Sequence, residues 1–434
     1  MKIKKKILIV NCYFDEFRLP IRRKTKVPQA MTPAYLAGAF SPELCDIKLY
    51  NEQYSGPLES DALLSWPDML VLTGLNTAFD RMLHLTAYAR TKNRHVIVVA
   101  GGPAIRALPI YSQAFFDICC SGDVEQLCEV ISETFGKDYV SRDFLDKGWL
   151  IPRYDMAYWM TWIGYVESSR NCYCNCKFCS LTAEGSKYQH YDLEYLRMQF
   201  KALGKRRVVI FLDNNFNCPN QQLFEQKIEL IKELRSKKQF DHWCALVSGD
   251  FFNNGESINK IKNTGCLSLF SGVETFDKQA LINFNKFQNA IQPQNNVIRN
   301  CLNAGIAFYY GLVFDVASRS ISDLKDELDI IVNDPEITLP SYISLSVPIL
   351  KTPFFYECLE NNLILPHIRI RDLNSSTITL QPLDSMPDVV QFVKDIQTMS
   401  IFRKNIIPHS FQFYRRYRKK LAAFHMGLAL YNAL

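Results

Sequence analysis

Three cysteines at a short, uneven spacing are the residues of this sequence best suited to chemistry. Cys172, Cys176 and Cys179 stand in the run NCYCNCKFC, with three residues between the first pair and two between the second. A loop this short can place three thiolates around three irons of a four-iron, four-sulfur cube. The fourth iron then has no protein ligand, and an open position on a metal is where a substrate or cosubstrate can bind.

A structural zinc site and a chance cluster in a cysteine-rich chain are the alternatives for this loop. Zinc in a structural site takes four protein ligands, and no CxxC or HxxxH sequence follows to complete such a set. The remaining cysteine of the run, Cys174, is interpreted as a spare thiol that points away from the cluster. We expect the chain to tolerate its replacement, whereas loss of any of the other three should abolish cluster binding.

The CxxxCxxC motif with an aromatic residue before its last cysteine resembles the radical S-adenosylmethionine (SAM) superfamily. The resemblance implies that SAM binds the open iron through its amino and carboxylate groups. It also implies that one electron from the cluster cleaves SAM to a 5′-deoxyadenosyl radical, and that Phe178 lies near the adenine. A flavodoxin- or ferredoxin-type protein is the implied electron donor.

Polar residues at the ends of two predicted strands are candidates for further SAM contacts. Asp213 and Asn214 end a strand, in a turn that resembles the one that holds the SAM amino nitrogen in this family. A nitrogen of this kind needs hydrogen-bond acceptors, although Asp213 can also close an Asx turn. By the same resemblance, Glu274 approaches the SAM ribose. The stretch Lys286-x-Gln288-Asn289 matches the cobalamin-dependent branch of the family, and we assign it no chemistry.

The first 140 residues alternate short apolar strands with helices. This rhythm predicts a parallel sheet with helices on both faces. Thr32 and Asp123 are predicted to cap two of the helices. The predicted strands are 7–10, 46–50, 69–73, 95–100 and 116–120, and the predicted helices are 34–40, 80–91 and 124–135.

Glycines follow several of these strands, where ligands of open parallel sheets bind. A glycine lets the backbone approach a flat ligand closely, although tight turns need glycine too. With the run Met31–Ala37, the region resembles the cobalamin-binding domain that precedes many radical SAM enzymes. An Asp-x-His-x-x-Gly motif is absent, so we expect cobalamin to bind without a histidine lower ligand. The candidate cobalamin contacts are Thr73, Gly74, Gly101, Gly102, Pro103 and Gly122.

A second alternation of strands and helices begins near residue 163 and resembles the partial barrel of radical SAM enzymes. Asp192 is predicted to cap a helix that Gly204 ends. The predicted fold class is α/β: an N-terminal doubly wound, Rossmann-like cobalamin-binding domain, a radical SAM partial (β/α)6 barrel and a helical C-terminal segment. The predicted boundaries are 1–140, an aromatic-rich linker 141–162, 163–352 and 353–434. The six predicted barrel strands are 163–167, 208–213, 243–247, 267–274, 307–314 and 342–347.

Composition limits where the chain works and what it binds. Fourteen cysteines without a signal peptide favour a reducing, cytoplasmic location. The net charge of +6 collects mainly in Arg403–Lys420, which argues against a broad nucleic-acid-binding face. Phe413, Tyr417, Leu421, Phe424 and Leu428 repeat at helical spacing. They predict one helix packed on the barrel mouth, or a basic helix on the inner face of an anionic membrane.

These features together predict a cobalamin-dependent radical SAM enzyme that methylates an unactivated carbon of a lipid or other small molecule. By resemblance, the deoxyadenosyl radical takes a hydrogen atom and methylcobalamin then supplies the methyl group. One alternative is another radical SAM reaction, such as ring rearrangement, cyclisation or methylthiolation. Methylthiotransferases hold a second cluster with three cysteines of an N-terminal domain, and Cys12 and Cys45 resemble part of that set. The other is a corrinoid-binding sensor or carrier without catalysis.

Overall fold

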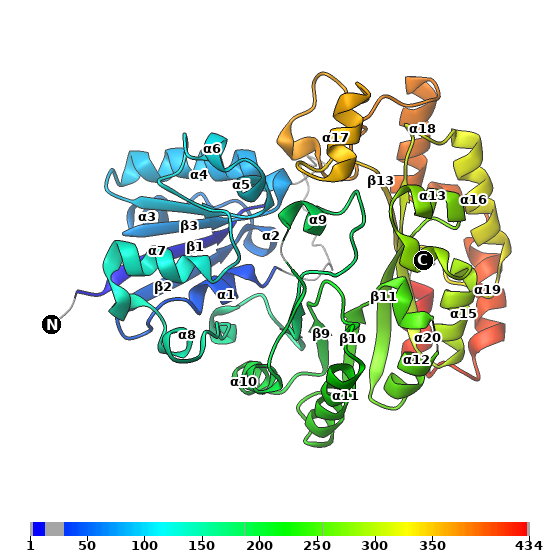
Figure 1. The fold of residues 1–434 in the computed structure, drawn as a ribbon, viewed down its shortest axis with the longest axis horizontal. Helices are drawn as coiled ribbons and strands as arrows, with labels where there is room; N and C mark the ends of the chain where they lie inside the picture. Colours follow the sequence, from blue (N-terminus) through cyan, green and yellow to red (C-terminus); the bar gives the residue numbers. More distant parts are fainter. Residues whose placement is uncertain (1–2, 14–29, 186, 254, 432–434) are drawn as a thin grey trace. The chain divides into compact units, whose positions relative to one another are not determined.

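The computed structural model describes residues 3–13, 30–185, 187–253 and 255–431. Contacts divide the chain into two compact units, which are described separately (Figure 1). Unit 1 comprises residues 1–161, 197–204 and 369–374, and unit 2 comprises residues 162–196, 205–368 and 375–434.

Unit 1 contains a five-stranded parallel sheet in the order β2-β1-β3-β4-β5. All five predicted strands are present, although β4 and β5 begin two residues later than expected. The chain adds strands on one side of β1 and then, from β3 onward, on the other side. The position between β1 and β3 is therefore the switch point at which doubly wound sheets bind ligands. The strands are β1 Lys5–Asn11, β2 Cys45–Asn51, β3 Met69–Thr73, β4 Ile97–Gly101 and β5 Ile118–Cys120.

Both faces of this sheet are covered by helices, as predicted (Figure 1). Alternate residues of β1 point to opposite faces: Ile7 and Ile9 join one buried cluster with α1 and α7, while Leu8 and Val10 join another with α3, α4 and α5. The helices of unit 1 are α1 Thr32–Ala37, α2 Glu52–Ser55, α3 Asp61–Ser65, α4 Phe79–Lys92, α5 Pro103–Ala107, α6 Pro109–Ser112, α7 Gln126–Phe135 and α8 Arg142–Lys147.

Two predicted helix caps in unit 1 are wrong. Helix α1 already includes Thr32, and its N-cap residue Met31 makes no side-chain cap hydrogen bond. Helix α7 begins at Gln126, because the carboxylate of Asp123 pairs with Arg106 at 2.9 Å instead of capping the helix. In both cases the backbone enters the helix at a different residue from the one with the suitable side chain.

Three aromatic residues of the predicted linker, Tyr154, Tyr158 and Trp159, pack within unit 1. Tyr154 and Trp159 are buried. The hydroxyl of Tyr158 accepts a hydrogen bond from the backbone N–H of Asn51 at 2.9 Å and lies 2.7 Å from the hydroxyl of Ser55. These contacts tie the segment to the end of β2, so it forms part of the unit's own surface layer.

Unit 2 contains the six predicted strands as an open parallel sheet in the order β13-β12-β11-β10-β9-β6. Apart from two short strands, neighbours along the chain are neighbours in the sheet. Parallel strands of this kind need crossover connections, which α11, α12, α15 and α16 provide. The strands are β6 Ile163–Val166, β9 Val208–Phe211, β10 His242–Leu246, β11 Cys266–Glu274, β12 Ala307–Phe314 and β13 Tyr342–Leu345.

Helices of unit 2 lie between these strands and in the C-terminal region. They are α9 Ser180–Glu184, α11 Gln221–Ser236, α12 Glu256–Ile261, α13 Lys278–Asn283, α14 Phe287–Ala290, α15 Gln294–Asn303, α16 Ile321–Asn333, α17 Pro353–Glu360, α18 Met386–Gln397, α19 Ile406–Tyr417 and α20 Ala423–Tyr431. Helix α10, Leu193–Leu203, is divided between the units. The predicted cap is confirmed, because Asp192 accepts from the backbone of Glu194 at 2.7 Å, and Gly204 follows the last turn with φ +69°.

The last part of the C-terminal segment, from Phe413 to Leu428, belongs to two helices, α19 and α20, where the sequence predicted one. Phe413, Tyr417 and Leu421 are buried, whereas Phe424 lies beyond a turn and is half exposed. The segment also packs at the opposite end of the sheet from the one expected. The hydroxyl of Tyr309, near the start of β12, donates to the backbone of Leu428 at 2.9 Å. No helix within the described residues is long and apolar enough to cross a membrane.

Candidate functional site

The cysteine loop lies at the carboxyl end of the first strand of unit 2. Two short strands, β7 Ser169–Arg170 and β8 Gln189–His190, pair in an antiparallel ladder on either side of the loop. Backbone hydrogen bonds of Lys177 then hold its far end. Its N–H donates to the carbonyl of Phe284 at 3.0 Å, and its carbonyl accepts from the N–H of Phe354 at 3.0 Å. The loop is therefore fixed at its base and near its tip.

Two of the three motif sulfurs accept N–H hydrogen bonds. The backbone of Cys174 donates to the sulfur of Cys172 at 3.4 Å, and the side chain of Gln288 donates to that of Cys176 at 3.4 Å. A cysteine binds metal as its thiolate, and N–H donors stabilise a thiolate. The surroundings of Cys172 and Cys176 therefore fit cluster ligands.

The ionisation of these thiols depends on their surroundings. A hydrogen bond from the Cys174 thiol lowers the pKa of Cys172 to about 7. Burial raises the pKa of Cys176, and it raises the pKa of Cys179 to about 11. The thiol of Cys174 is a close neighbour of the Cys172 sulfur and affects its pKa, and the prediction that Cys174 is a spare thiol that points away from the cluster stays a prediction.

The predicted SAM contacts at the end of β9, Asp213 and Asn214, form hydrogen bonds with the residues that lead into the cysteine loop. The carboxylate of Asp213 is buried and accepts hydrogen bonds from the backbone of Ser168 at 3.2 Å, from its hydroxyl at 2.7 Å and from the hydroxyl of Ser169. The side-chain oxygen of Asn214 accepts from the backbone of Asn171 at 3.1 Å, where φ is +62°. Contact of Asp213 or Asn214 with SAM stays a prediction.

Glu274 ends β11 at an irregular position and forms a buried ion pair. Its φ is +65°, and the register between β11 and β12 shifts at this point. The carboxylate pairs with the ammonium of Lys286, and their side chains are only 10% and 9% exposed. Burial alone would lower the pKa of Lys286, but the charge and hydrogen bond of Glu274, together with the nearby thiols of Cys176 and Cys179, outweigh it and raise that pKa. A contact between Glu274 and the SAM ribose stays a prediction.

Phe178 lies between this ion pair and an apolar cluster. Its ring packs edge-to-face on Phe284 with 5.2 Å between centroids, and the ammonium of Lys286 is 5.8 Å from its centre. Phe284 belongs to a buried cluster with Phe354, Cys358 and Leu380. Phe178 therefore has an apolar neighbourhood on the side of Phe284 and a charged one on the side of Lys286. The contact of Phe178 with adenine stays a prediction.

A polar network at the ends of β9 and β10 was not predicted from the sequence. The amide of Asn215 donates to the hydroxyl of Ser248 at 2.7 Å and to the sulfur of Cys172 at 3.9 Å. The hydroxyl of Tyr173 donates to Asp250 at 2.5 Å, and the amide of Asn217 donates to the same carboxylate oxygen at 2.7 Å. The polar residues that follow β9 in the sequence indicate a site at this strand end. They do not reveal which residues after β10 are their hydrogen-bond partners.

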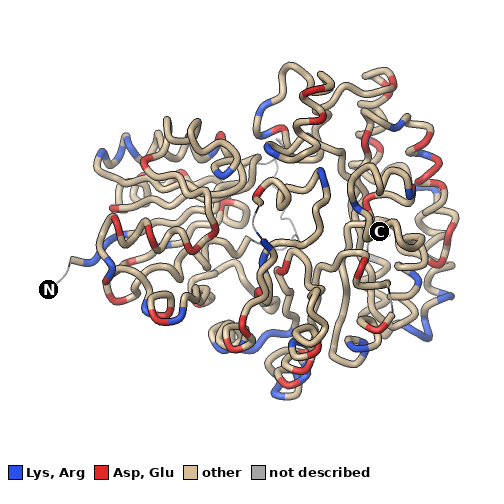
Figure 2. Tube along the Cα trace, viewed as in Figure 1, with Lys and Arg blue, Asp and Glu red and all other residues tan. Residues whose placement is uncertain are grey.

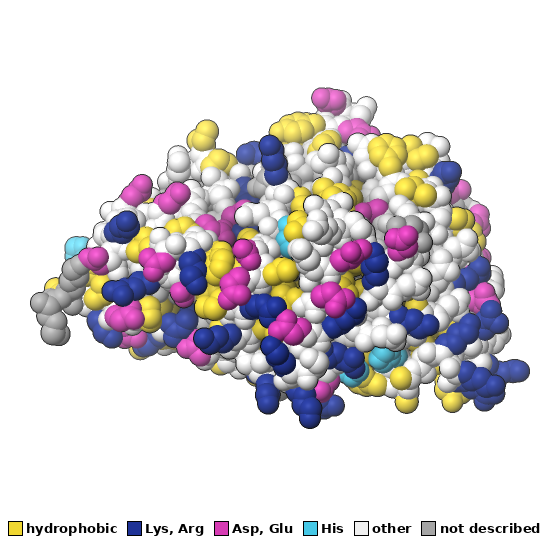
Figure 3. Space-filling view, turned by 60° about the horizontal axis from the view of Figure 1, so that its bottom comes forward, with side chains coloured by type: hydrophobic (Ala, Val, Ile, Leu, Met, Phe, Trp, Pro, Cys, Tyr) yellow, Lys and Arg dark blue, Asp and Glu magenta, His cyan; other side chains and the backbone are white. Residues whose placement is uncertain are grey.

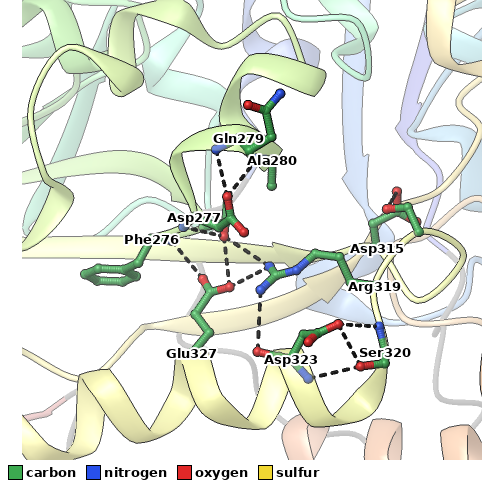
Figure 4. A network of polar contacts seen from close by, with 11 residues as sticks. Phe276, Asp277, Gln279, Ala280, Asp315, Arg319, Ser320, Asp323 and Glu327 are labelled. Atoms are coloured by element: carbon green, nitrogen blue, oxygen red, sulfur yellow. Dashed lines mark hydrogen bonds and ion pairs between the residues drawn. The ribbon is translucent and has the colours of Figure 1, made fainter.

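A cavity of about 370 Å³ lies at the carboxyl ends of β11 and β12, beside α13 and α17. Lys177, Phe284 and Arg319 contribute to its lining. Figure 4 shows that two charged residues of its lining, Asp277 and Arg319, already have partners. Arg319 donates to Glu327 at 2.6 Å, and Asp277 caps α13 by accepting from two backbone N–H groups. These pairs stiffen the rim of the cavity.

The predicted cobalamin contacts lie at the carboxyl ends of the unit 1 strands, which end next to one another in the sheet. Thr73 is opposite Gly101, which is opposite Cys120. Gly102 has φ +122°, and a Cβ there would lie 2.5 Å from the carbonyl oxygen of Gly74. The next strand end is tied down by Arg106, which donates to the carbonyl of Gly122 at 2.7 Å. The glycines at the ends of β3, β4 and β5 would let a large flat ligand approach the backbone, and the individual contacts, that of Pro103 included, stay predictions.

Comparison with known proteins places the cysteine loop in a defined family region. Residues 166–314 match the Radical SAM superfamily. Bacteriochlorophyllide d C-8(2)-methyltransferase of Chlorobaculum tepidum is 24% identical over 352 residues, which are 75% of each chain. Hopanoid C-2 methylase of Rhodopseudomonas palustris is 21% identical over 291 residues, which are 63% of this chain and 54% of that protein.

Two solved structures share the fold of both units. The radical SAM methyltransferase TsrM from Kitasatospora setae, with tryptophan substrate and a SAM analogue bound, gives a TM-score of 0.61 at 14% identity and covers 82% of this chain and 76% of its own. The cobalamin-dependent radical enzyme OxsB, with aqua-cobalamin and SAM bound, gives 0.58 at 17% identity and covers 83% of this chain. This chain spans about half the length of OxsB, 55%.

Proposed function

We propose that this chain, which carries a radical SAM domain and is a radical SAM enzyme, methylates an unactivated carbon of a lipid or other small molecule with the help of cobalamin. The observation that carries the proposal is the loop of Cys172, Cys176 and Cys179 at the carboxyl end of an open six-stranded parallel sheet. A second parallel sheet in the same chain supports the cobalamin part, because glycines at its strand ends would let a flat ligand approach the backbone.

The residues of unit 2 supply binding, orientation and a dry surface. Cys172, Cys176 and Cys179 would hold the cluster. The buried pair of Glu274 and Lys286 places a fixed dipole beside Phe178, where the polar part of SAM would meet the ring. When bound, cluster and SAM supply a 5′-deoxyadenosyl radical, and cobalamin supplies a transferable methyl group. The protein then needs to position the substrate and keep out water, for which no general acid or base is required.

The residues of unit 1 would hold cobalamin by backbone contact. Thr73, Gly74, Gly101, Gly102 and Gly122 stand at the strand ends where such a ligand would bind. No histidine occupies these positions, so the proposal includes a cobalt without a histidine lower ligand. A flavodoxin- or ferredoxin-type protein is proposed as the electron donor.

The proposed reaction fixes a product ratio that can be measured. One substrate C–H, two SAM and two electrons give one C–CH3, one 5′-deoxyadenosine, one methionine and one S-adenosylhomocysteine. The experiment is an anaerobic incubation of reconstituted, cobalamin-loaded protein with reductant and a polycyclic lipid extract. Equal amounts of 5′-deoxyadenosine and S-adenosylhomocysteine are expected. Radical cleavage without S-adenosylhomocysteine would instead support a ring rearrangement or cyclisation.

Methylthiolation is disfavoured by the places of Cys12 and Cys45. Cys45 starts β2 and lies opposite Lys5 at the start of β1, whereas Cys12 follows the end of β1. Seven residues of extended strand separate the two levels by about 23 Å. These two cysteines therefore do not share a second cluster. A corrinoid sensor would keep its biological activity in a Cys176→Ala variant, whereas the enzyme would not.

We also propose that the outer face of α19 touches an anionic membrane surface. Residues 401–434 contain seven Lys or Arg and no Asp or Glu, so 43 basic and 44 acidic residues remain in the rest of the chain. Blue positions follow one another along this segment in Figure 2, and Figure 3 shows basic side chains gathered in one area of the surface. Ile407, Phe411 and Tyr414 form an exposed stripe on α19, 75%, 61% and 45% exposed.

Vesicle sedimentation tests this surface directly. The protein should sediment with phosphatidylglycerol-containing vesicles and not with pure phosphatidylcholine, and salt should weaken the interaction because it screens the charges. An Ile407→Ser/Phe411→Ser variant should lose sedimentation, whereas Val390→Ser on α18, also exposed, should not. Equal sedimentation of all three proteins would contradict the proposal.

A further inference from the structure

The side-chain amide of Gln288 donates a hydrogen bond to the buried sulfur of Cys176. Cys176 is 6% exposed, less than either of the other two motif cysteines. The amide nitrogen of Gln288 lies 3.4 Å from its sulfur, within hydrogen-bond range for sulfur. A thiolate only accepts hydrogen bonds, so the amide must present its NH2 group to it.

Gln288 is held in place from both sides. Its neighbour Lys286 is anchored in the buried ion pair with Glu274. On the other side, the amide of Asn289 donates to the carbonyl of Gly272 at 2.8 Å, and its backbone carbonyl accepts from Gln294 at 2.5 Å. A donor whose neighbours are both fixed needs little reorganisation to make its bond. The stretch Lys286–Asn289 thus gains a physical role that the sequence did not reveal.

Hydrogen bonds to cluster sulfurs favour the reduced state. Reduction adds an electron that is shared over the irons and their sulfur ligands, and an N–H pointed at a ligand sulfur stabilises the added negative charge. The donor from Cys174 to the Cys172 sulfur is a backbone group of the loop itself. Gln288 comes from a different element, α14, so a side-chain substitution can remove its bond and leave the loop sequence unchanged.

We propose that Gln288 is a positioning residue that donates a hydrogen bond to the Cys176 ligand sulfur and thereby raises the reduction potential of the cluster. Asn215 contributes a weaker bond of the same kind to Cys172, at 3.9 Å. The inference rests on the cluster of the proposed function and does not depend on methyl transfer.

The test is a redox titration of the reconstituted cluster, followed by electron paramagnetic resonance (EPR) of the reduced state. Gln288→Leu removes the donor at similar size, and Gln288→Glu replaces it with a negative charge. Both should shift the midpoint to more negative potential, with the larger shift in Gln288→Glu. The matched control is Gln391→Leu on α18, an exposed glutamine that donates to Asp395, and it should keep the wild-type midpoint.

Iron content separates the possible outcomes. Unchanged iron with a shifted midpoint in both variants supports the inference, and unchanged iron with a wild-type midpoint overturns it. If the variants lose iron, wild-type protein labelled with ¹⁵N-glutamine decides: the reduced cluster should show a weak ¹⁵N coupling in pulsed EPR, and no coupling would overturn the inference. A wild type with a normal cluster and no methyl product would instead refute only the proposed function.

Discussion

At the scale of single residues, the four thiols of the cysteine loop differ in their surroundings. The sulfurs of Cys172 and Cys176 accept N–H hydrogen bonds, and the neighbouring thiol of Cys174 lowers the pKa of Cys172. N–H donors prepare a sulfur to carry the charge of a metal ligand. We therefore expect Cys172 and Cys176 to act as ligands together with Cys179, and Cys174 to remain a thiol.

Cysteine replacements should give different iron contents. Cys176→Ala should lose the cluster, because two thiolates do not hold a cube whose fourth iron is already open. Cys174→Ala should retain about four irons per chain, the content of one cubane. Anaerobic reconstitution followed by iron and sulfide analysis makes the comparison. Loss of iron in Cys174→Ala would show that this cysteine is a ligand.

The buried pair of Glu274 and Lys286 should couple strongly in a double-mutant cycle. Lys286→Met leaves the Glu274 carboxylate buried without its partner, which we expect to cost about 3–5 kcal/mol. Adding Glu274→Gln should recover much of that loss, since no unpaired charge then remains. Hydrogen exchange of peptides from β11 measures the local opening energy. Additive losses in the double variant would contradict the pairing.

At the scale of elements, the ends of strands decide where ligands can approach. In unit 1, Gly102 follows β4 in a left-handed conformation, with the carbonyl of Gly74 closely packed against its Cα. In unit 2, Glu274 turns the end of β11 with φ +65°. Both irregular positions lie where a parallel sheet offers its binding edge, and both depend on backbone geometry that only a few residues accept.

Gly102→Ala should disturb this edge of unit 1. The positive φ costs about 1–3 kcal/mol for a residue with a Cβ, and the 2.5 Å approach to the Gly74 carbonyl adds a clash. We expect lower thermal stability of the unit and weaker cobalamin uptake. Gly427→Ala is the control, since nothing lies within 4 Å of its Cβ position and alanine favours a helix. Equal melting temperatures for the two variants would contradict the packing described.

The sequence predicted strands better than it predicted contacts between them. Strands such as Met69–Thr73 and Ala307–Phe314 were located to the residue, because each is an apolar run. Asp123 was misassigned because its partner, Arg106, comes from another element. Likewise the pairing of Lys286 with Glu274 depends on the bend at the end of β11. The candidate cysteine ligands follow from spacing alone, but the hydrogen-bond donors to Cys172 and Cys176 could not be predicted.

At the scale of the whole molecule, two units each have their own parallel sheet and the edge where a cofactor would bind. The cysteine loop belongs to unit 2, and the glycine-rich strand ends belong to unit 1. Buried residues line both faces of the unit 1 sheet without residues from the barrel. Each cofactor can therefore be lost without the other, if each unit retains its fold.

Cobalamin uptake should consequently survive loss of the cluster. Cys176→Ala should bind as much cobalamin as the wild type, measured from the visible absorbance of the corrinoid after anaerobic gel filtration. Its production of 5′-deoxyadenosine should be abolished at the same time. If cobalamin and iron are always lost together, the two sites are not independent.

The central claim is that one iron of the cluster is open to SAM. The measurement that tests it most directly is the EPR spectrum of the anaerobically reduced protein before and after addition of SAM. We expect a [4Fe-4S] signal whose g-values change when SAM is added, because SAM becomes a ligand of the open iron. A signal that SAM leaves unchanged, or a protein that contains zinc in place of iron, would contradict the account.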